Sequence, residues 1–238
     1  MKNFPATEVH LLDNPIWFAL SSEQAYLAQT NGLARRFPSD VAPFGGVAGQ
    51  SAAEYQALAE ILAGDAVALF LDLPPALPAG WSMILRGELD QMVFEAPRPD
   101  APVFRELTAA DVPEMLALTK LTQPGPFLPR TIELGSYFGI RESGALVAMA
   151  GERLRLTGFT EVSAVCTHPD FRGRGYGNAL MSAVIAGIMR RGETPFLHVK
   201  TDNPAVGLYQ KMGFRVRSRL HLAVIRYGSS DHQPGDPR

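Results

Sequence analysis

The sequence holds one cysteine, Cys166, among its 238 residues. A single cysteine excludes an internal disulfide and a thiolate-rich metal cluster, and it fits a reducing compartment. No uninterrupted apolar run approaches the roughly 20 residues that span a bilayer, and the first residues lack the apolar stretch of a secretion signal. We therefore expect a soluble, cytoplasmic protein that does not contact a membrane.

Charge is also sparse. Charged residues make up 19% of the chain and hydrophobic residues 46%, a balance that excludes disorder over the whole chain. Residues 1–170 hold 11 Lys and Arg against 20 Asp and Glu, whereas residues 171–238 hold 11 against 4. The basic C-terminal quarter indicates an anionic ligand there, although a solvated basic face has the same pattern. The acidity of the longer part mildly favours a cationic small partner.

The pattern of residues 1–95 predicts an accessory α/β region. Asn14 or Asp13 can cap its first helix, and Ser51 its second. The proline-rich residues 96–102 predict an extended linker. The expected elements before the linker are helices over 13–30 and 52–64, a buried strand over 66–71 and a hairpin over 81–94.

After the linker, residues 103–227 predict an α/β domain whose order of elements requires a mixed sheet, and residues 228–238 predict a disordered tail. The expected strands cover residues 103–107, 135–141, 145–156, 159–167, 196–200, 214–216 and 220–227. The expected helices cover 108–121, 176–191 and 204–212, the last capped by Asn203, and residues 122–130 form a loop.

A glycine-rich turn joins the strand over 159–167 to the long helix, with the sequence Arg172-Gly173-Arg174-Gly175-Tyr176-Gly177. Its glycines let the backbone approach a ligand, and the first amides of the helix have no internal partner. Together with the two arginines, this arrangement suits a pyrophosphate. A P-loop and a dinucleotide fingerprint are both excluded, because Asn178 and its neighbours depart from those motifs.

The turn matches the pattern R/Q-x-x-G-x-G/A and so resembles the coenzyme A signature of the GNAT N-acetyltransferase superfamily. The segment TDNPAVGLYQKMGF at 201–214 is similar to a second element of that family. The resemblance covers roughly residues 103–227 and implies a GNAT fold with split central parallel strands, which bind acetyl-CoA. Residues 1–95 are then an accessory region or a degenerate GNAT-like half. The residues implied to bind the cofactor are Val165, Cys166, Thr167, Arg172, Gly173, Arg174, Gly175, Tyr176, Gly177, Asn178, Asn203 and Tyr209.

The resemblance also implies catalytic roles. Tyr209 is expected to protonate the departing thiolate, because a phenol is protonated at neutral pH. The base is expected to be Glu161 or Glu152, between which the sequence does not decide, with His198 as a weaker candidate. Cys166 is more readily explained as a buried strand residue than as an acyl carrier. The five histidines show no metal-ligand spacing, so no metal is expected.

The implied function is transfer of an acetyl or short acyl group from acetyl-CoA to a primary amine by direct attack in a ternary complex. The acceptor is a small molecule or a protein amine, and the expected assembly is a monomer or homodimer. A CoA-binding sensor without turnover is the alternative, and a nucleic-acid partner is not expected. The weak candidates for acceptor contacts are Thr122, Gln123, Phe127, Arg130 and His198.

Overall fold

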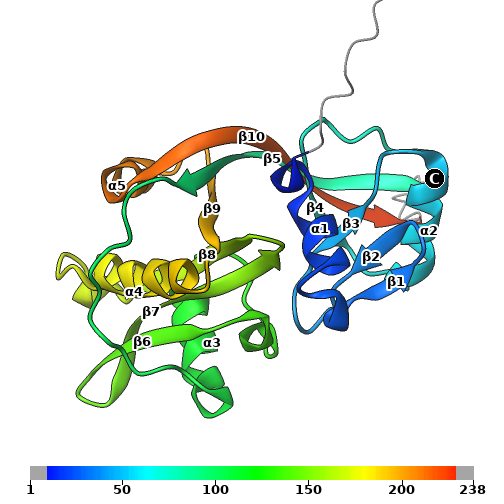
Figure 1. Ribbon diagram of the computed structural model, residues 1–238. Coiled ribbons are helices and arrows are strands. Elements are labelled where there is room, and N and C mark those ends of the chain that lie inside the picture. The colour runs from blue at the N-terminus through cyan, green and yellow to red at the C-terminus, as the bar shows by residue number, and fades with distance from the viewer. Residues whose placement is uncertain (1–9, 229–238) are drawn as a thin grey trace, which may run out of the picture.

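The computed structural model describes residues 10–228, which form an α/β fold around a sheet of seven strands and a sheet of three (Figure 1). The large sheet contains β4 (Val67–Leu71), β5 (Trp81–Phe94), β6 (Tyr137–Glu142), β7 (Ala145–Leu156), β8 (Phe159–Thr167), β9 (Thr194–Lys200) and β10 (Phe214–Tyr227). The small sheet contains β1 (Gln29–Asn31), β2 (Ala34–Arg36) and β3 (Gly45–Val47). The α-helices are α1 (Pro15–Ser21), α2 (Ala52–Leu62), α3 (Val112–Thr122), α4 (Tyr176–Arg190) and α5 (Val206–Met212).

The large sheet is mixed, as the sequence predicts. Its strands follow the order β4-β10-β5-β9-β8-β7-β6, and β8 and β9 run parallel while the other neighbouring strands run antiparallel. Within residues 10–228, no helix has the length and apolar character that crossing a bilayer demands. The last ten residues of the predicted tail, 229–238, lie outside the described residues.

The two parallel strands part in mid-sheet. Their pairing begins at Phe159 and Thr194 and ends at Glu161 and Phe196. Beyond that point β8 pairs only with β7, and β9 pairs only with β5. A bulge at Ala164, where φ is +52°, interrupts the pairing of β8 with β7 and bends the strand. The expected split of the central strands is therefore present.

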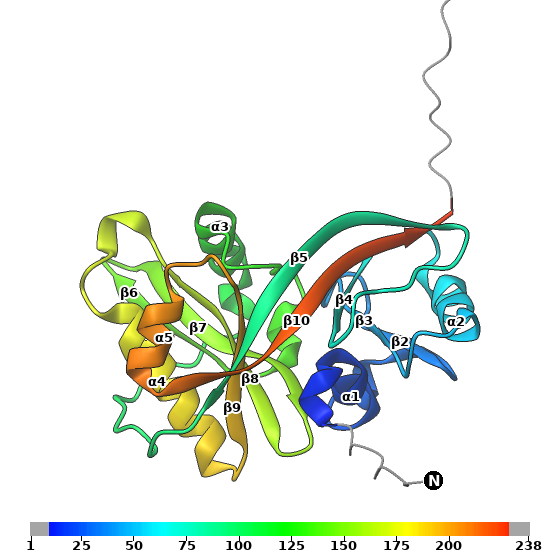
Figure 2. The same ribbon diagram turned by 90° about the horizontal axis from the view of Figure 1, so that it is seen from above.

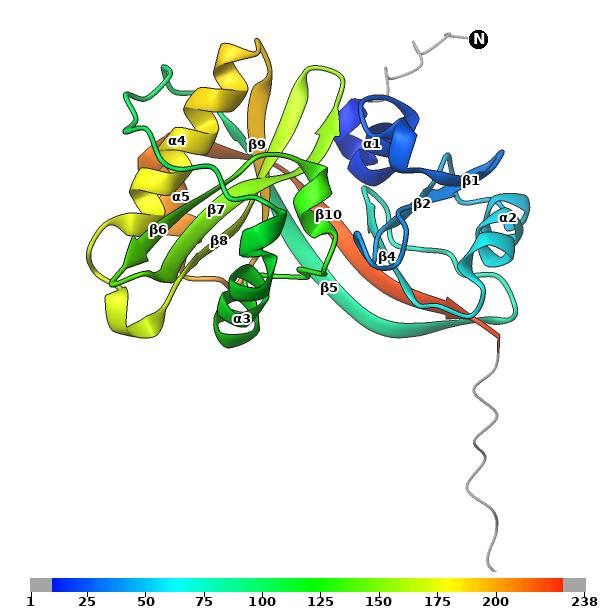
Figure 3. The same ribbon diagram turned by 90° about the horizontal axis from the view of Figure 1, so that it is seen from below.

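Helices α3 and α4 cover opposite faces of the sheet beside the split (Figure 3). Successive side chains of a strand point to opposite faces, and β7 shows this directly. Ala148 and Ala150 pack in the cluster that contains the apolar face of α4, whereas Met149 packs in the cluster that contains α3. Helix α4 starts and ends within one residue of its predicted bounds. Helix α3 ends at Thr122, one residue past its predicted end, but it starts at Val112 instead of Thr108 because a 3-10 turn over Ala109–Asp111 precedes it.

The first predicted helix is wrong in its length, because the chain leaves the helix at Ser21 instead of continuing to residue 30. The buried side chain of Gln24 explains the break: its amide nitrogen donates to the carbonyls of Leu134 and Arg153, at 3.1 and 2.7 Å, so long-range bonds replace helical ones. Asn14 precedes the helix but donates to the Val47 carbonyl instead of capping it. Ser51 caps α2 as predicted.

The predicted hairpin over 81–94 is also wrong. These residues form one strand, β5, which pairs along its whole length with β10, itself one strand where two were predicted. Gly87, in the polar stretch that was expected to turn, pairs with Leu222 in the ladder. The two strands form a curved ribbon, which connects β4, the neighbour of β10, with β9, the neighbour of β5 (Figure 2).

The linker over 96–102 has no regular structure, and the predicted strand at 103–107 is reduced to one bridge between Glu106 and Phe138. Val103 is fully exposed, so it adds nothing to a core that would hold a strand in place. Strands from both sides of the linker share the large sheet. The division into residues 1–95 and 103–227 stays a prediction about folding units.

Candidate active site

The turn before α4 presents free backbone amides. The amide of Arg172 donates to Pro169 and that of Ala179 to Gly175, but among the described residues no acceptor is found for the six amides between them. Gly173 and Gly175 have φ of +79° and +78°, a conformation that favours glycine, and open space surrounds the position of a β-carbon at each. The N-terminal end of α4 therefore offers donors and a partial positive charge to an anion.

Side chains around the turn add charge. Arg172 and Arg174 are exposed, and the guanidinium of Arg174 lies over the ring of Phe171, with Cζ 4.8 Å from its centroid. The hydroxyl of Tyr176 is hydrogen-bonded to the carboxylate of Glu142, at the end of β6. This bond holds the turn against the β6–β7 hairpin.

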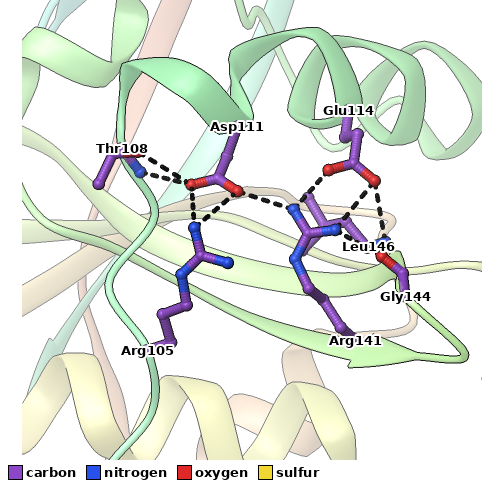
Figure 4. A network of polar contacts seen from close by, with 7 residues as sticks. All are labelled: Arg105, Thr108, Asp111, Glu114, Arg141, Gly144 and Leu146. Carbon is purple, nitrogen blue, oxygen red and sulfur yellow. Dashed lines mark hydrogen bonds and ion pairs between the residues drawn. The ribbon is translucent and has the colours of Figure 1, made fainter.

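A polar network fixes that hairpin to α3 (Figure 4). Arg141 Nη2 lies 2.7 Å from the buried carboxylate of Asp111, and Arg141 also pairs with Glu114. The backbone amide of Thr108 donates to Asp111 and, together with Arg141, lowers the pKa of this carboxyl. The network supports the glycine-rich turn from outside and does not contact it directly.

The free edge of β8 follows the split. Val165, Cys166 and Thr167 lie beyond the last pair with β9, so their outward backbone groups have no strand partner on that side. A β-carbon on Gly177 would lie 3.8 Å from the side chains of Val165 and Thr167, so α4 approaches this edge closely. Burial raises the pKa of the Cys166 thiol to about 11, which disfavours a thiolate nucleophile.

A cavity of about 570 Å³ opens at the split and extends toward the N-terminal part of the chain. The splayed strands contribute Ser163, Val165, Leu197 and Val199. Other walls come from Phe44 before β4, from β4 itself, and from the loop after α3. The cavity thus unites segments that lie more than 150 residues apart in the sequence, and its volume suits a small molecule.

Tyr209 on α5 lines this cavity, as does Asn203. Burial raises the pKa of the Tyr209 phenol, so the hydroxyl carries its proton at neutral pH. Asn203 does not cap α5 directly, because the helix begins at Val206; its side chain instead accepts a hydrogen bond from the amide of Ala205 at 2.9 Å. Pro204 precedes the helix instead of occupying its first turn.

Glu161 is held in a buried pair. Its oxygens accept hydrogen bonds from Arg153 Nη2 at 2.6 Å and Nε at 2.8 Å, and its side chain is fully buried. Burial alone favours a neutral carboxyl, but the charge and hydrogen bonds of Arg153 outweigh it and lower the pKa of Glu161 to about 2.

His198 completes this cluster and lines the cavity. The amide group of Gln91 donates to the carbonyl of Leu12 and accepts from Arg217, which fixes its orientation. Its second N–H therefore points to His198 Nε2, 3.1 Å away, so that nitrogen accepts and Nδ1 donates to Glu161 at 2.7 Å. Both ring nitrogens of His198 are thus occupied by hydrogen bonds.

The other predicted base, Glu152, is not among the residues that line the cavity. Its carboxylate is buried and pairs with Arg191 Nη2 at 2.9 Å. The structure therefore separates the two glutamates, because Glu161 belongs to a cluster that borders the cavity and Glu152 does not.

Of the predicted acceptor contacts in the loop after α3, only one lines the cavity. Gln123 lines the cavity. Thr122 instead donates to the Leu118 carbonyl, and Phe127 packs edge-to-face on Tyr137. Arg130 pairs with Asp40 and Glu133, which ties the loop to the N-terminal part of the chain. Pro124, Gly125 and Pro126 face the cavity in their place.

Sequence reasoning missed the contribution of the N-terminal part to the cavity, above all Phe44 and Phe70. Their rings lie 5.4 Å apart, and the guanidinium carbon of Arg153 lies 5.0 Å from the centroid of Phe44. Neither phenylalanine belongs to a motif, so the sequence offers no signal for either. No group of three or more potential metal ligands occurs in the described part of the chain.

Known proteins resemble this chain in sequence and in fold. A family model described as FR47-like protein matches residues 137–222. An acetyltransferase of Yersinia enterocolitica is 43% identical over 58 residues, and one of Pectobacterium atrosepticum is 48% identical over 50 residues. These matches span 23% and 20% of this chain, and only 40% and 35% of the two relatives.

Two solved structures extend the comparison. A GCN5-related N-acetyltransferase of Kribbella flavida shares the fold, with a TM-score of 0.56 and 19% identity over 92% of this chain and 93% of that one. A crystal structure from Novosphingobium aromaticivorans, assigned to the acetyltransferases of the GNAT family, superposes with a TM-score of 0.84. It is 36% identical, and the match covers 93% of this chain and all of that one. The chain belongs to the GNAT family of acetyltransferases.

Proposed function

We propose that the protein transfers an acetyl or other short acyl group from acetyl-CoA to a primary amine. One observation carries the proposal: the strands β8 and β9 part after Glu161 and Phe196, and the free edge of β8 that follows runs to Thr167, beside a turn with six unbonded amides. A free strand edge and an anion-binding turn at one end of the same gap suit a ligand that has both an amide-bearing arm and a pyrophosphate.

The residues present fit coenzyme A. The amides of residues 173–178, with Arg172 and Arg174, would hold the pyrophosphate, and the backbone edge from Val165 to Thr167 would hold the pantetheine arm. When bound, acetyl-CoA supplies the acyl group as a thioester, which an amine attacks directly. The new bond joins the amine nitrogen to the acyl carbon, and the carbon–sulfur bond breaks.

Tyr209 is the proposed proton donor to the departing thiolate. Its phenol lines the cavity, and its raised pKa keeps the proton available over the neutral range. The Tyr209 phenolate is then reprotonated by solvent. Asn203 lines the same part of the cavity, where it fixes the chain just before α5.

Neither glutamate is the proposed base. Glu161 has a pKa of about 2 and is bonded to Arg153 and His198, and Glu152 lies outside the cavity. No carboxylate lines the cavity among the described residues, and both nitrogens of His198 are occupied. We propose that the acceptor reacts as the free amine and that its proton passes to water.

The deciding experiment combines calorimetry with mass spectrometry. Desulfo-CoA is expected to bind with measurable heat, and incubation with acetyl-CoA and a metabolite extract is expected to yield products heavier by one acetyl group. Binding without any acetylated product would instead support the alternative of a CoA-binding sensor. Absence of both signals would contradict either function.

A further inference from the structure

One edge of the Arg153 guanidinium faces the cavity. Arg153 is only 9% exposed and lines the cavity, and its Nε and Nη2 bond Glu161. For Nη1, no hydrogen-bond partner is found within residues 10–228. A β-carbon on Gly125, which also lines the cavity, would lie 3.9 Å from this nitrogen. A buried cation thus retains free N–H donors that point toward the loop wall of the cavity.

The charge of the cavity excludes a polycation as the best ligand. The charged side chains that line it are Arg153 and Lys200, and no Asp or Glu lines it within the described part of the chain. Glu161 lies behind Arg153 and its charge is already matched. The expectation of a cationic acceptor, drawn from the acidity of residues 1–170, therefore does not extend to the site, where a polyamine would find like charge.

The rest of the wall near Arg153 is apolar. The rings of Phe44 and Phe70 flank its guanidinium, with centroids 5.0 and 5.8 Å from Cζ. Aliphatic side chains from three strands extend this surface: Ala68, Leu89, Leu222 and Val224. Such a wall binds an apolar group by removing it from water, and it offers few partners to a polar one.

We propose that the acceptor is a free α-amino acid with an apolar side chain, whose carboxylate is bound by Arg153. This inference rests on the proposed function and names its substrate class. The free donors of Arg153 match a carboxylate, and Phe44 and Phe70 receive the side chain. The α-amine, one carbon away from the carboxylate, is the nucleophile. Arg153 acts here as a specificity-determining residue.

The test compares matched acceptors. L-leucine and L-phenylalanine are assayed with acetyl-CoA beside isoamylamine and phenethylamine, which lack only the carboxylate, and beside L-leucinamide and spermidine. Because hydrogen bonds to charged groups are strong, kcat/KM is expected to be about tenfold to a hundredfold higher for each amino acid than for its decarboxylated amine. Equal or higher values for the amines, leucinamide or spermidine would overturn the proposal.

Variants connect the preference to Arg153. Arg153→Lys keeps a charge beside Glu161 but loses Nη1, so the ratio between amino acid and amine is expected to fall toward one. The double variant Arg153→Met with Glu161→Gln removes both buried charges together and guards against misfolding of the single variant. Arg155→Lys is the matched control, because Arg155 lies on the same strand but pairs with Glu193. A preference that survives in both Arg153 variants would overturn the assignment.

A binding measurement keeps this inference separate from the proposed function. In the presence of CoA, N-acetyl-L-phenylalanine is expected to raise the melting temperature of the wild-type protein more than N-phenethylacetamide does. The difference is expected to vanish in Arg153→Lys. Turnover of amines without this difference would remove the carboxylate site alone, whereas the difference without any turnover would remove the proposed function and leave the site.

Discussion

The proposed active site has a donor side and an acceptor side, which are built in opposite ways. The donor side comprises the turn Arg172–Asn178 and the free edge of β8, which lie close together in sequence and present unpaired backbone groups. The acceptor side comprises Arg153, Phe44, Phe70 and residues 124–126, which are buried side chains and loop residues brought together by tertiary packing. The first depends on local backbone conformation, and the second on the stability of the whole fold.

The comparison predicts its largest effect for the acceptor side, in Glu161→Ala. This substitution leaves Arg153 buried without its partner, which is expected to lower the free energy of unfolding by about 3–5 kcal/mol. Denaturant titration measures the change. Glu133→Ala is the control, because Glu133 forms an exposed pair and its loss is expected to cost less than about 1 kcal/mol. Similar values for the two variants would show that the buried cluster is not a structural centre.

Tyr209→Phe tests the point where the two sides meet. The substitution keeps the aromatic ring, which packs against Phe214, but removes the hydroxyl. If Tyr209 protonates the thiolate, kcat is expected to fall about a hundredfold while the dissociation constant for CoA stays within about twofold. Steady-state kinetics and calorimetry separate the two quantities. An unchanged kcat would assign the proton to water and leave Tyr209 as a packing residue.

Gly175→Val addresses the donor side alone. At φ of +78° a β-branched residue is strained by roughly 1–2 kcal/mol, and its side chain would crowd the free amides, so CoA is expected to bind at least about tenfold more weakly. Gly158→Val is a matched control, because Gly158 has the same φ and equally open surroundings but lies in the β7–β8 turn. Both variants share the strain, and only the first is expected to affect CoA binding in calorimetry. Equal affinities would contradict an anion site at α4.

The same contrast explains what the sequence could predict. The conformation of the turn before α4 was predictable, because its glycines and the start of the helix lie within a few residues and depend on local backbone preferences. The split of β8 from β9 followed only from resemblance to a family, since no residue at Glu161 or Phe196 marks where the pairing ends.

The acceptor side was not predictable, because its geometry depends on contacts across the whole chain. Gln24 ends α1 through bonds to residues more than 100 positions away, and β5 continues past Gly87 because β10 pairs with it. Glu161 and Glu152 look alike on neighbouring strands, yet their partners Arg153 and Arg191 give them different surroundings. Alternation along a strand identifies a buried carboxylate but not the cation that neutralises it.

The smallest expected effect concerns pH and sharpens the assignment of the base. If no enzyme group deprotonates the acceptor, kcat/KM rises about tenfold per pH unit until the pH reaches the pKa of the acceptor amine itself. Because burial raises the pKa of Tyr209 above its ordinary value of 10, no decline in kcat/KM is expected below pH 10.

The measurement is a set of pH profiles of kcat/KM for acceptors whose amines differ in pKa, recorded for the wild type and for Glu152→Gln. The inflection is expected to move with the acceptor and not with the variant, because Glu152 lies outside the cavity. An inflection shared by all acceptors would belong to the protein, and its loss in Glu152→Gln would restore that carboxylate as the base.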